Sequence, residues 1–148
     1  MSSKNLTANT QMGILKPVQN VFEAIVDPEK MSGYFISSGS GRLEAGQTIH
    51  WIWEDYGVEH DIKVQKVEKD KLVSFNWTAS GIETLVELSL ESKGKNQTLI
   101  KVKETEWPLD EKGVERCLGQ TQGWVNMLCC LKAYVEYDIN LRVGGLIK

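Results

Sequence analysis

One long stretch near the end of the chain, residues 114–138, has the pattern of a single amphipathic helix and contains no proline. Its apolar positions recur at steps of three and four residues, which is the period of an α-helix. These positions are Leu118, Thr121, Trp124, Val125, Leu128, Leu131 and Val135. An apolar stripe of this length has to be buried against another layer of structure. We therefore expect the rest of the chain to supply one sheet that packs around this helix.

Five segments between residues 47 and 105 alternate apolar and polar side chains with a period of two. The predicted strands are residues 47–53, 58–66, 72–78, 83–91 and 97–105. Short links rich in Gly, Asp, Asn and Ser separate them, so neighbouring strands in the sequence should pair as hairpins. The alternation is typical of an antiparallel sheet with one face in water.

The sequence before these strands predicts one further strand and two short helices. Residues 8–15 have a strand pattern, and Pro17 then suits the first turn of a helix. This helix should stop at Asp27, because a residue that precedes a proline disfavours the helical region. Pro28 then begins a second, shorter helix, and residues 37–41 have the composition of a flexible loop.

Together these elements predict an α+β fold. We expect a curved antiparallel sheet of six to seven strands around one long C-terminal helix, with two short helices after the first strand. The 148 residues suit a single domain, 1–148, whose tail at 140–148 we expect to be loosely ordered.

Composition and charge narrow the classes of partner. The net charge is -3 and no run of Lys or Arg occurs, which argues against binding to nucleic acid or to an anionic membrane surface. No apolar run approaches the ~20 residues of a membrane span. The first six residues lack the apolar core of a signal peptide, so we expect a cytoplasmic protein.

The chain offers few groups for metal or cofactor chemistry. The three cysteines, Cys117, Cys129 and Cys130, all fall on the predicted helix, and we interpret them as reduced thiols that fill space on its flank. There are two histidines, and no phosphate loop, dinucleotide fingerprint or Ser-His-Asp spacing occurs. We therefore expect no metal ion and no cofactor.

Three stretches resemble a known superfamily. Residues 21–31 are similar to the opening helix pair of the START-like (SRPBCC, helix-grip) superfamily, residues 72–77 to its middle strand, and residues 123–128 to the start of its gripping helix. The branch that the chain resembles is that of proteins related to the activator of the ninety-kilodalton heat-shock chaperone's ATPase. The resemblance covers about residues 8–138. It departs at Tyr34-Phe35, where this branch commonly carries a tryptophan.

The resemblance implies a hydrophobic cavity between the long helix and the sheet. Members of the superfamily bind lipids, hormones or polyketides, or catalyse cyclisation and ring hydroxylation, whereas the chaperone activators use the fold to bind protein. Likeness at the level of the fold does not choose among these activities.

His60 and Glu104 are the polar residues most suited to chemistry in such a cavity. Each lies on the inward, apolar parity of its predicted strand. A neutral His60 could orient a ligand or act as a general base, or it could be a core-edge histidine bonded to a neighbour. Glu104 could be an unpaired carboxylate with a raised pKa, or an ordinary solvated residue at a strand end. A contact between the two would form the simplest acid–base unit that the sequence offers. His50, on the opposite parity of its strand, should face solvent.

Aromatic side chains are more numerous at inward positions than a minimal core requires. They could leave a slot for a flat ligand, or they could form plain core. The predicted ligand-binding residues are Tyr34, Trp51, Trp53, His60, Trp77, Glu104, Trp124 and Met127. Gly119 and Gly123, one turn apart on the long helix, should allow another element to approach closely.

Three functional hypotheses follow. The first is a non-enzymatic protein that binds a small hydrophobic or aromatic molecule, with the short helices and residues 37–41 as a gate. The second is a chaperone-interacting module with a filled cavity and a functional outer surface. The third is a cavity enzyme that uses His60 with a carboxylate. Both a monomer and a homodimer remain open.

Overall fold

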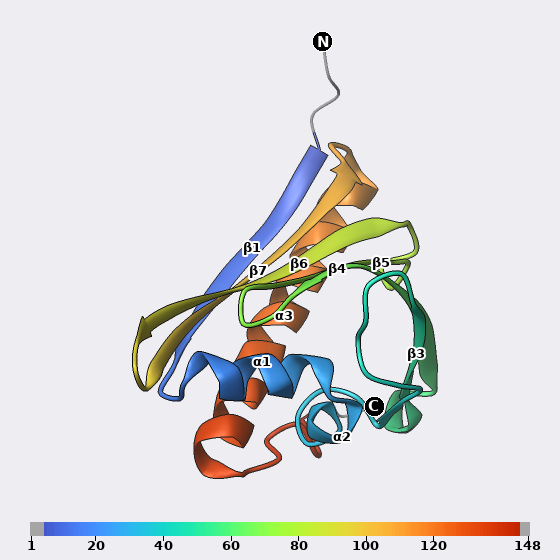
Figure 1. Ribbon diagram of the computed structural model, residues 1–148. Coiled ribbons are helices and arrows are strands. Elements are labelled where there is room, and N and C mark those ends of the chain that lie inside the picture. The colour runs from blue at the N-terminus through green and yellow to red at the C-terminus, as the bar shows by residue number, and fades with distance from the viewer. Residues whose placement is uncertain (1–4, 146–148) are drawn as a thin grey trace.

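The computed structural model describes residues 5–145 and has the predicted α+β helix-grip architecture (Figure 1). One curved sheet holds seven strands in the order β1-β7-β6-β5-β4-β3-β2. The elements in chain order are β1 (Asn5–Ile14), α1 (Val18–Val26), α2 (Pro28–Met31), β2 (Ser38–Gly39), β3 (Thr48–Trp53), the 3-10 turn η1 (Glu54–Tyr56), β4 (Val58–Glu68), β5 (Leu72–Trp77), β6 (Thr84–Gly94), β7 (Gln97–Pro108) and α3 (Glu111–Tyr137).

The five predicted hairpin strands pair in sequence order, as the short links between them indicated. Each strand from β3 to β7 pairs antiparallel with the next one in the sequence, and β1 pairs antiparallel with the other edge of β7. Two strands, β5 and β6, therefore separate β4 from β7. This order decides which inward side chains can meet.

The prediction of a flexible loop at residues 37–41 is wrong in its centre. Ser38 and Gly39 form the edge strand β2, in which they pair with Ile52 and Trp51 of β3. A Cβ at Gly39 would lie 3.1 Å from Pro28 and 3.2 Å from Trp51, so a larger residue would force these neighbours to shift by a few tenths of an ångström. Tertiary packing thus overrides the loop-like composition.

Helix α3 begins at Glu111, three residues earlier than the apolar pattern indicated. The Asp110 side chain caps it by accepting a hydrogen bond from the backbone N–H of Gly113 at 2.8 Å. The predicted apolar stripe is only partly buried. Trp124 and Leu128 are in the core, whereas Leu118 is 66% exposed and Val125 is 43% exposed.

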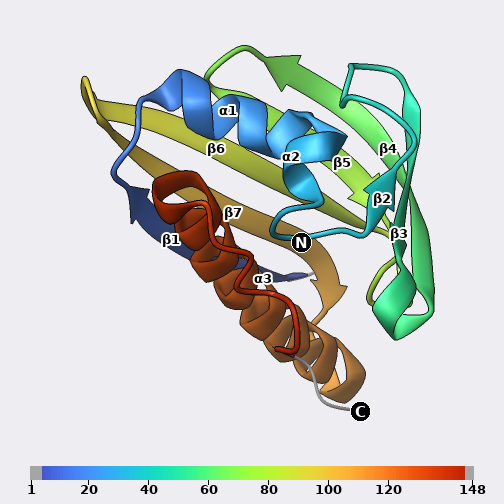
Figure 2. The ribbon, with the colours of Figure 1, turned by 90° about the horizontal axis from the view of Figure 1, so that it is seen from below.

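The exposed stripe positions follow from where α3 lies. The helix packs mainly on β1 and β7, at one side of the sheet, and α1 and α2 lie beside it over the same concave face (Figure 2). Lys132 donates to the Gly13 carbonyl at 2.7 Å, and Glu136 accepts from the Leu15 N–H at 2.9 Å, which ties the end of the helix to β1. The concave space in front of β3, β4 and β5 is therefore left to side chains rather than to helix.

After α3 the chain reverses at Asp138, whose φ of 55° is left-handed, and runs back along the helix (Figure 2). The looseness expected of the tail remains a prediction, and its last residues, 146–148, lie outside the described residues. Residues 1–4 also lie outside the described residues, so the structure does not test our expectation that the N-terminus lacks a signal peptide. Within residues 5–145 no helix has the length and apolar character needed to cross a membrane.

Candidate functional site

A pocket of about 300 Å³ opens between α3 and the strands β3, β4 and β5. Its walls are mostly aromatic and aliphatic, with amide, imidazole and guanidinium groups among them. The lining residues are Tyr34, Phe35, Trp53, Tyr56, Val58, His60, Trp77, Ala79, Gln120, Gly123, Trp124, Asn126, Met127 and Arg142. Its position, beside the part of the sheet that α3 does not cover, is where the fold leaves unfilled space.

Most of the residues predicted to bind a ligand line this pocket. The structure places there Tyr34, Trp53, His60, Trp77, Trp124 and Met127. Trp51 does not line it: its side chain is 1% exposed and packs behind the pocket against Phe35 and Phe75. Trp51 and Trp53 share a face of β3, but the edge strand β2 and the chain after α2 cover Trp51. Glu104 is the other predicted residue that the pocket does not expose.

Two tryptophans form the floor of the pocket. The rings of Trp77 and Trp124 have centroids 5.6 Å apart and are tilted by 33°. Phe35 contacts Trp124 from a second side, with centroids 5.9 Å apart, and meets Trp53 edge-on at 5.4 Å. Aromatic rings packed in this way support one another, so the pocket has stiff walls.

Glu104 is completely buried and holds these two indoles in place. One carboxylate oxygen accepts hydrogen bonds from Trp124 Nε1 at 2.7 Å and Gln120 Nε2 at 3.1 Å. The other accepts from Trp77 Nε1 at 2.9 Å and Thr84 Oγ1 at 2.6 Å. An ionised carboxylate has acceptors only, so four donors suit its charged form. None of the ion pairs among the described residues involves Glu104.

This arrangement corrects two expectations about Glu104. It is not a solvated residue at a strand end, because β5, β6 and α3 enclose it. It does not form a pair with His60 either, because the strands β5 and β6 lie between β4 and β7, and the four hydrogen-bond partners of Glu104 are other residues. The sequence thus located an inward carboxylate correctly but not the groups around it.

His60 lies in the pocket wall and is half-buried. Its ring lies 5.8 Å from that of Trp53 and 5.9 Å from that of Trp77. Burial lowers the pKa of His60 below its ordinary value, and the charge of His50 lowers it further. His60 is therefore mostly neutral near pH 7. None of the hydrogen bonds or ion pairs described for residues 5–145 gives His60 a carboxylate partner.

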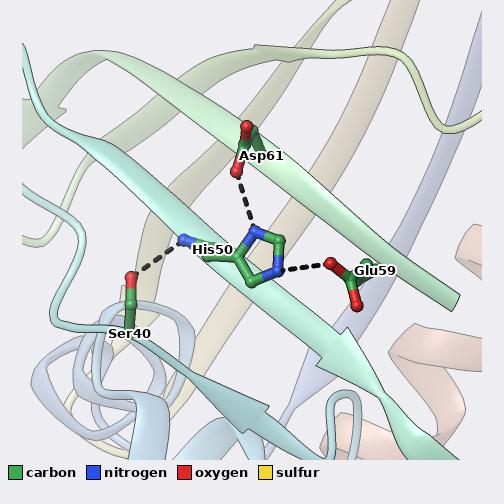
Figure 3. A network of polar contacts seen from close by, with 4 residues as sticks. All are labelled: Ser40, His50, Glu59 and Asp61. Atoms are coloured by element: carbon green, nitrogen blue, oxygen red, sulfur yellow. Dashed lines mark hydrogen bonds and ion pairs between the residues drawn. The ribbon is translucent and has the colours of Figure 1, made fainter.

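His50 is on the opposite face of the sheet, as its parity predicted (Figure 3). Its Nδ1 lies 2.8 Å from Asp61 and its Nε2 lies 3.2 Å from Glu59. The hydrogen bond with Asp61, together with the negative charges of Glu59 and Asp61, raises the pKa of His50. Ser40 next to β2 accepts from the His50 backbone N–H at 2.8 Å, so this cluster joins β2, β3 and β4 and stays away from the pocket.

Several lining residues were not predicted. Gln120, Gly123 and Asn126 lie on α3 at three-residue steps, next to Trp124 and Met127, so extending the inward helical face by one position would have found them. Tyr56 belongs to a turn and Arg142 to the tail, where no periodic pattern operates. We expected Gly119 and Gly123 to let another element approach α3 closely. This prediction is wrong, because no heavy atom lies within 4 Å of the position of a Cβ at either glycine.

The cysteines and acidic groups do not form a metal site within the described part of the chain. No cluster of three or more His, Cys, Asp or Glu residues there could hold a metal ion. Cys130 is buried and fills space as expected, but Cys129 is exposed, so that interpretation is wrong for Cys129. Burial raises the pKa of the Cys117 and Cys130 thiols, which makes them poor nucleophiles.

Comparison with known proteins identifies the family. The profile described as "Activator of Hsp90 ATPase homolog 1-like protein" matches residues 16–136. The chain belongs to this family. The Activator of Hsp90 ATPase homolog 1-like match spans both short helices, all strands from β2 to β7 and nearly all of α3, and so includes every residue that lines the pocket except Arg142.

Solved structures carry the same fold. The protein SSP2350 from Staphylococcus saprophyticus is 36% identical, with a TM-score of 0.81 over 93% of this chain and 96% of that one. The Aha1 dimer from Colwellia psychrerythraea is 22% identical, with a TM-score of 0.75 over 89% and 97% of the two chains. CalU16 from Micromonospora echinospora is 18% identical, with a TM-score of 0.71 over 95% and 88%. No curated protein shows a significant match to this chain.

Proposed function

We propose that this protein binds a small hydrophobic or aromatic molecule in the pocket between α3 and β3–β5, without catalysing a reaction on it. The observation that carries the proposal is the pocket itself, whose volume of about 300 Å³ lies at the lower end of the range for small-molecule sites. Its aromatic walls favour a flat, largely apolar ligand.

The polar groups of the pocket refine the ligand's chemistry. The indole N–H groups of Trp77 and Trp124 are bonded to Glu104, so these two residues offer a ligand only their carbon surfaces. A neutral His60 and the amide of Asn126 remain as hydrogen-bonding partners on the walls. A neutral ligand with one or two polar atoms fits this set better than a charged one, because Arg142 is already paired with Asp55.

The other two hypotheses have less support. A chaperone-interacting module predicts a filled cavity, whereas an open pocket is present. A cavity enzyme based on His60 and a carboxylate requires an acid–base pair, and Glu104 and His60 do not contact each other. Oligomeric state does not enter the proposal, since the pocket is built within one chain.

A fluorescence titration tests the proposal. N-phenyl-1-naphthylamine, a neutral aromatic probe, should quench the tryptophans of the pocket and gain emission of its own with a saturable, one-to-one curve. A ligand of ~20 non-hydrogen atoms at about −0.3 kcal/mol per atom would bind with a Kd of tens of micromolar. A panel of naphthols, flavonoids and fatty acids should then rank by flatness and size. Signals that rise linearly with every compound would argue against a binding site.

A further inference from the structure

The chain after α3 contacts the turn η1 on the far side of the pocket through Arg142. We propose that residues 139–145, the C-terminal strap, close the mouth of the pocket, and that Arg142 is the latch that holds them closed. This gate controls access to the pocket, and only the nature of the molecule that enters rests on the proposed function. The gate also gives a role to a segment whose sequence shows no helix or strand pattern.

Arg142 is the residue of the strap that faces inward. Its side chain is 11% exposed and lines the pocket, whereas its neighbours Leu141 and Val143 are 53% and 71% exposed. The guanidinium lies 2.6 Å from Asp55 Oδ1 and 5.3 Å from the centre of the Tyr56 ring. Asp55 and Tyr56 belong to η1, the turn between β3 and β4, on the side of the pocket opposite α3.

The strap is fixed at one end and latched at one point. At the fixed end the N–H groups of Asp138 and Ile139 bond to the Tyr134 and Ala133 carbonyls at 2.9 and 3.2 Å. Within the strap, Val143 donates to Asn140 and Gly145 donates to Arg142, which shapes a turn. Among the hydrogen bonds and ion pairs of residues 5–145, only the contact of Arg142 with Asp55 ties the strap to the far side of the pocket.

The strength of this latch suits a gate. Asp55 is 45% exposed, so the ion pair is partly solvated and screened by salt, and contacts of this kind are weak. The cation over Tyr56 adds directional attraction. Opening the strap therefore breaks the contacts of Arg142 with Asp55 and Tyr56 and leaves the hydrogen bonds of the sheet and α3 intact. Because the segment pivots at Asp138, it can swing away without unfolding the helix.

Acrylamide quenching tests the gate without any ligand. Acrylamide is a small neutral quencher that has to reach Trp53, Trp77 and Trp124 through the mouth of the pocket. Loss of a pair that is solvated only on its Asp55 side should raise the open population, so Arg142→Gln should increase the quenching constant of the accessible fraction by roughly two- to fivefold. Arg42→Gln is the matched control, because Arg42 forms an arginine–carboxylate pair with Glu23 at the same distance, 2.6 Å, on an exposed surface away from the pocket.

A charge-reversed pair separates the latch from a general effect of the substitution. Asp55→Arg alone should increase quenching as Arg142→Gln does, and the double variant Asp55→Arg/Arg142→Asp should restore values close to the wild type. Equal quenching in wild type and Arg142→Gln would overturn the gate. So would an increase of the same size in Arg42→Gln, or a double variant that is no better than the single ones.

Stopped-flow binding of N-phenyl-1-naphthylamine distinguishes failure of the gate from failure of the proposed function. If both hold, Arg142→Gln should raise the association and dissociation rates together, by a similar factor, with little change in Kd. Probe binding whose rates do not respond to Arg142→Gln would refute the gate alone. Absence of probe binding together with increased acrylamide quenching would refute the proposed function and support the gate.

Discussion

Replacing Glu104 with leucine should destabilise the protein by about 3–5 kcal/mol, the range seen when one partner of a buried charged network is removed. Leucine fills a similar volume but accepts no hydrogen bond. Four donors, from Trp77, Thr84, Gln120 and Trp124, would then lose their partner in a buried site. Urea unfolding followed by far-UV circular dichroism measures the change. Near-UV circular dichroism should also show loss of the ordered tryptophan signal.

Glu104→Gln gives a milder version of the same test. The amide keeps one acceptor oxygen but directs an NH₂ group at two donors. We expect a loss of about 2–3 kcal/mol, the low end of the range for two unsatisfied buried donors at about 1–3 kcal/mol each, because the neighbouring side chains can adjust. Glu91→Gln, at an exposed pair with Lys93 on the adjacent strand β6, should change stability by less than about 0.5 kcal/mol. A Glu104→Leu variant as stable as the wild type would show that the four bonds do not hold the pocket walls.

Filling the pocket from its helical wall should abolish ligand binding while leaving the fold intact. Gly123 lines the pocket, and no heavy atom lies within 4 Å of the Cβ that a substitution would add there. Leucine at this position should project into the ligand's space and lower the affinity for N-phenyl-1-naphthylamine by roughly 10- to 100-fold, the equivalent of overpacking by 1–3 kcal/mol. Stability should stay level or rise, because glycine within a helix costs ~1 kcal/mol relative to alanine.

Gly119→Leu is the matched control. Gly119 lies one helical turn earlier, is equally free of neighbours within 4 Å, and does not line the pocket. The same side chain on the same helix should therefore leave the affinity unchanged and give a similar gain in stability. If both leucine variants bind the probe like the wild type, or if both lose binding to the same extent, the ligand does not occupy this pocket.

The sequence predicted the architecture because its signals are local. Most ends of the predicted strands and short helices lie within two residues of their observed positions, whereas β1 and α3 begin three residues earlier than predicted and β6 and β7 end three residues later. The failures lie where distant parts of the chain decide the outcome. Residues Ser38 and Gly39 become a strand only because β3 offers them an edge. Leu118 and Val125 are exposed because α3 packs toward β1 and β7.

The site was predictable to the extent that strand parity controls it. Alternation correctly turned Trp53, His60 and Trp77 inward, and all three line the pocket. Parity does not say which strands are neighbours, so it could not predict that His60 and Glu104 lie apart. Nor could it predict that Trp77 and Trp124 bind the same carboxylate. Arg142 had no signal at all, because the contact that places it, with Asp55, joins parts of the chain 87 residues apart.

The most direct test of the account is native mass spectrometry of the wild-type protein and the Gly123→Leu variant, each purified gently and then extracted with organic solvent. We predict a reproducible added mass on the wild type that disappears on denaturation and is recovered as a small, largely apolar molecule in the extract. The same mass should be missing from Gly123→Leu and present on Gly119→Leu. A clean unliganded mass for the wild type, together with no saturable binding of any probe in the aromatic and lipid panel, would contradict the proposal that this pocket holds a ligand.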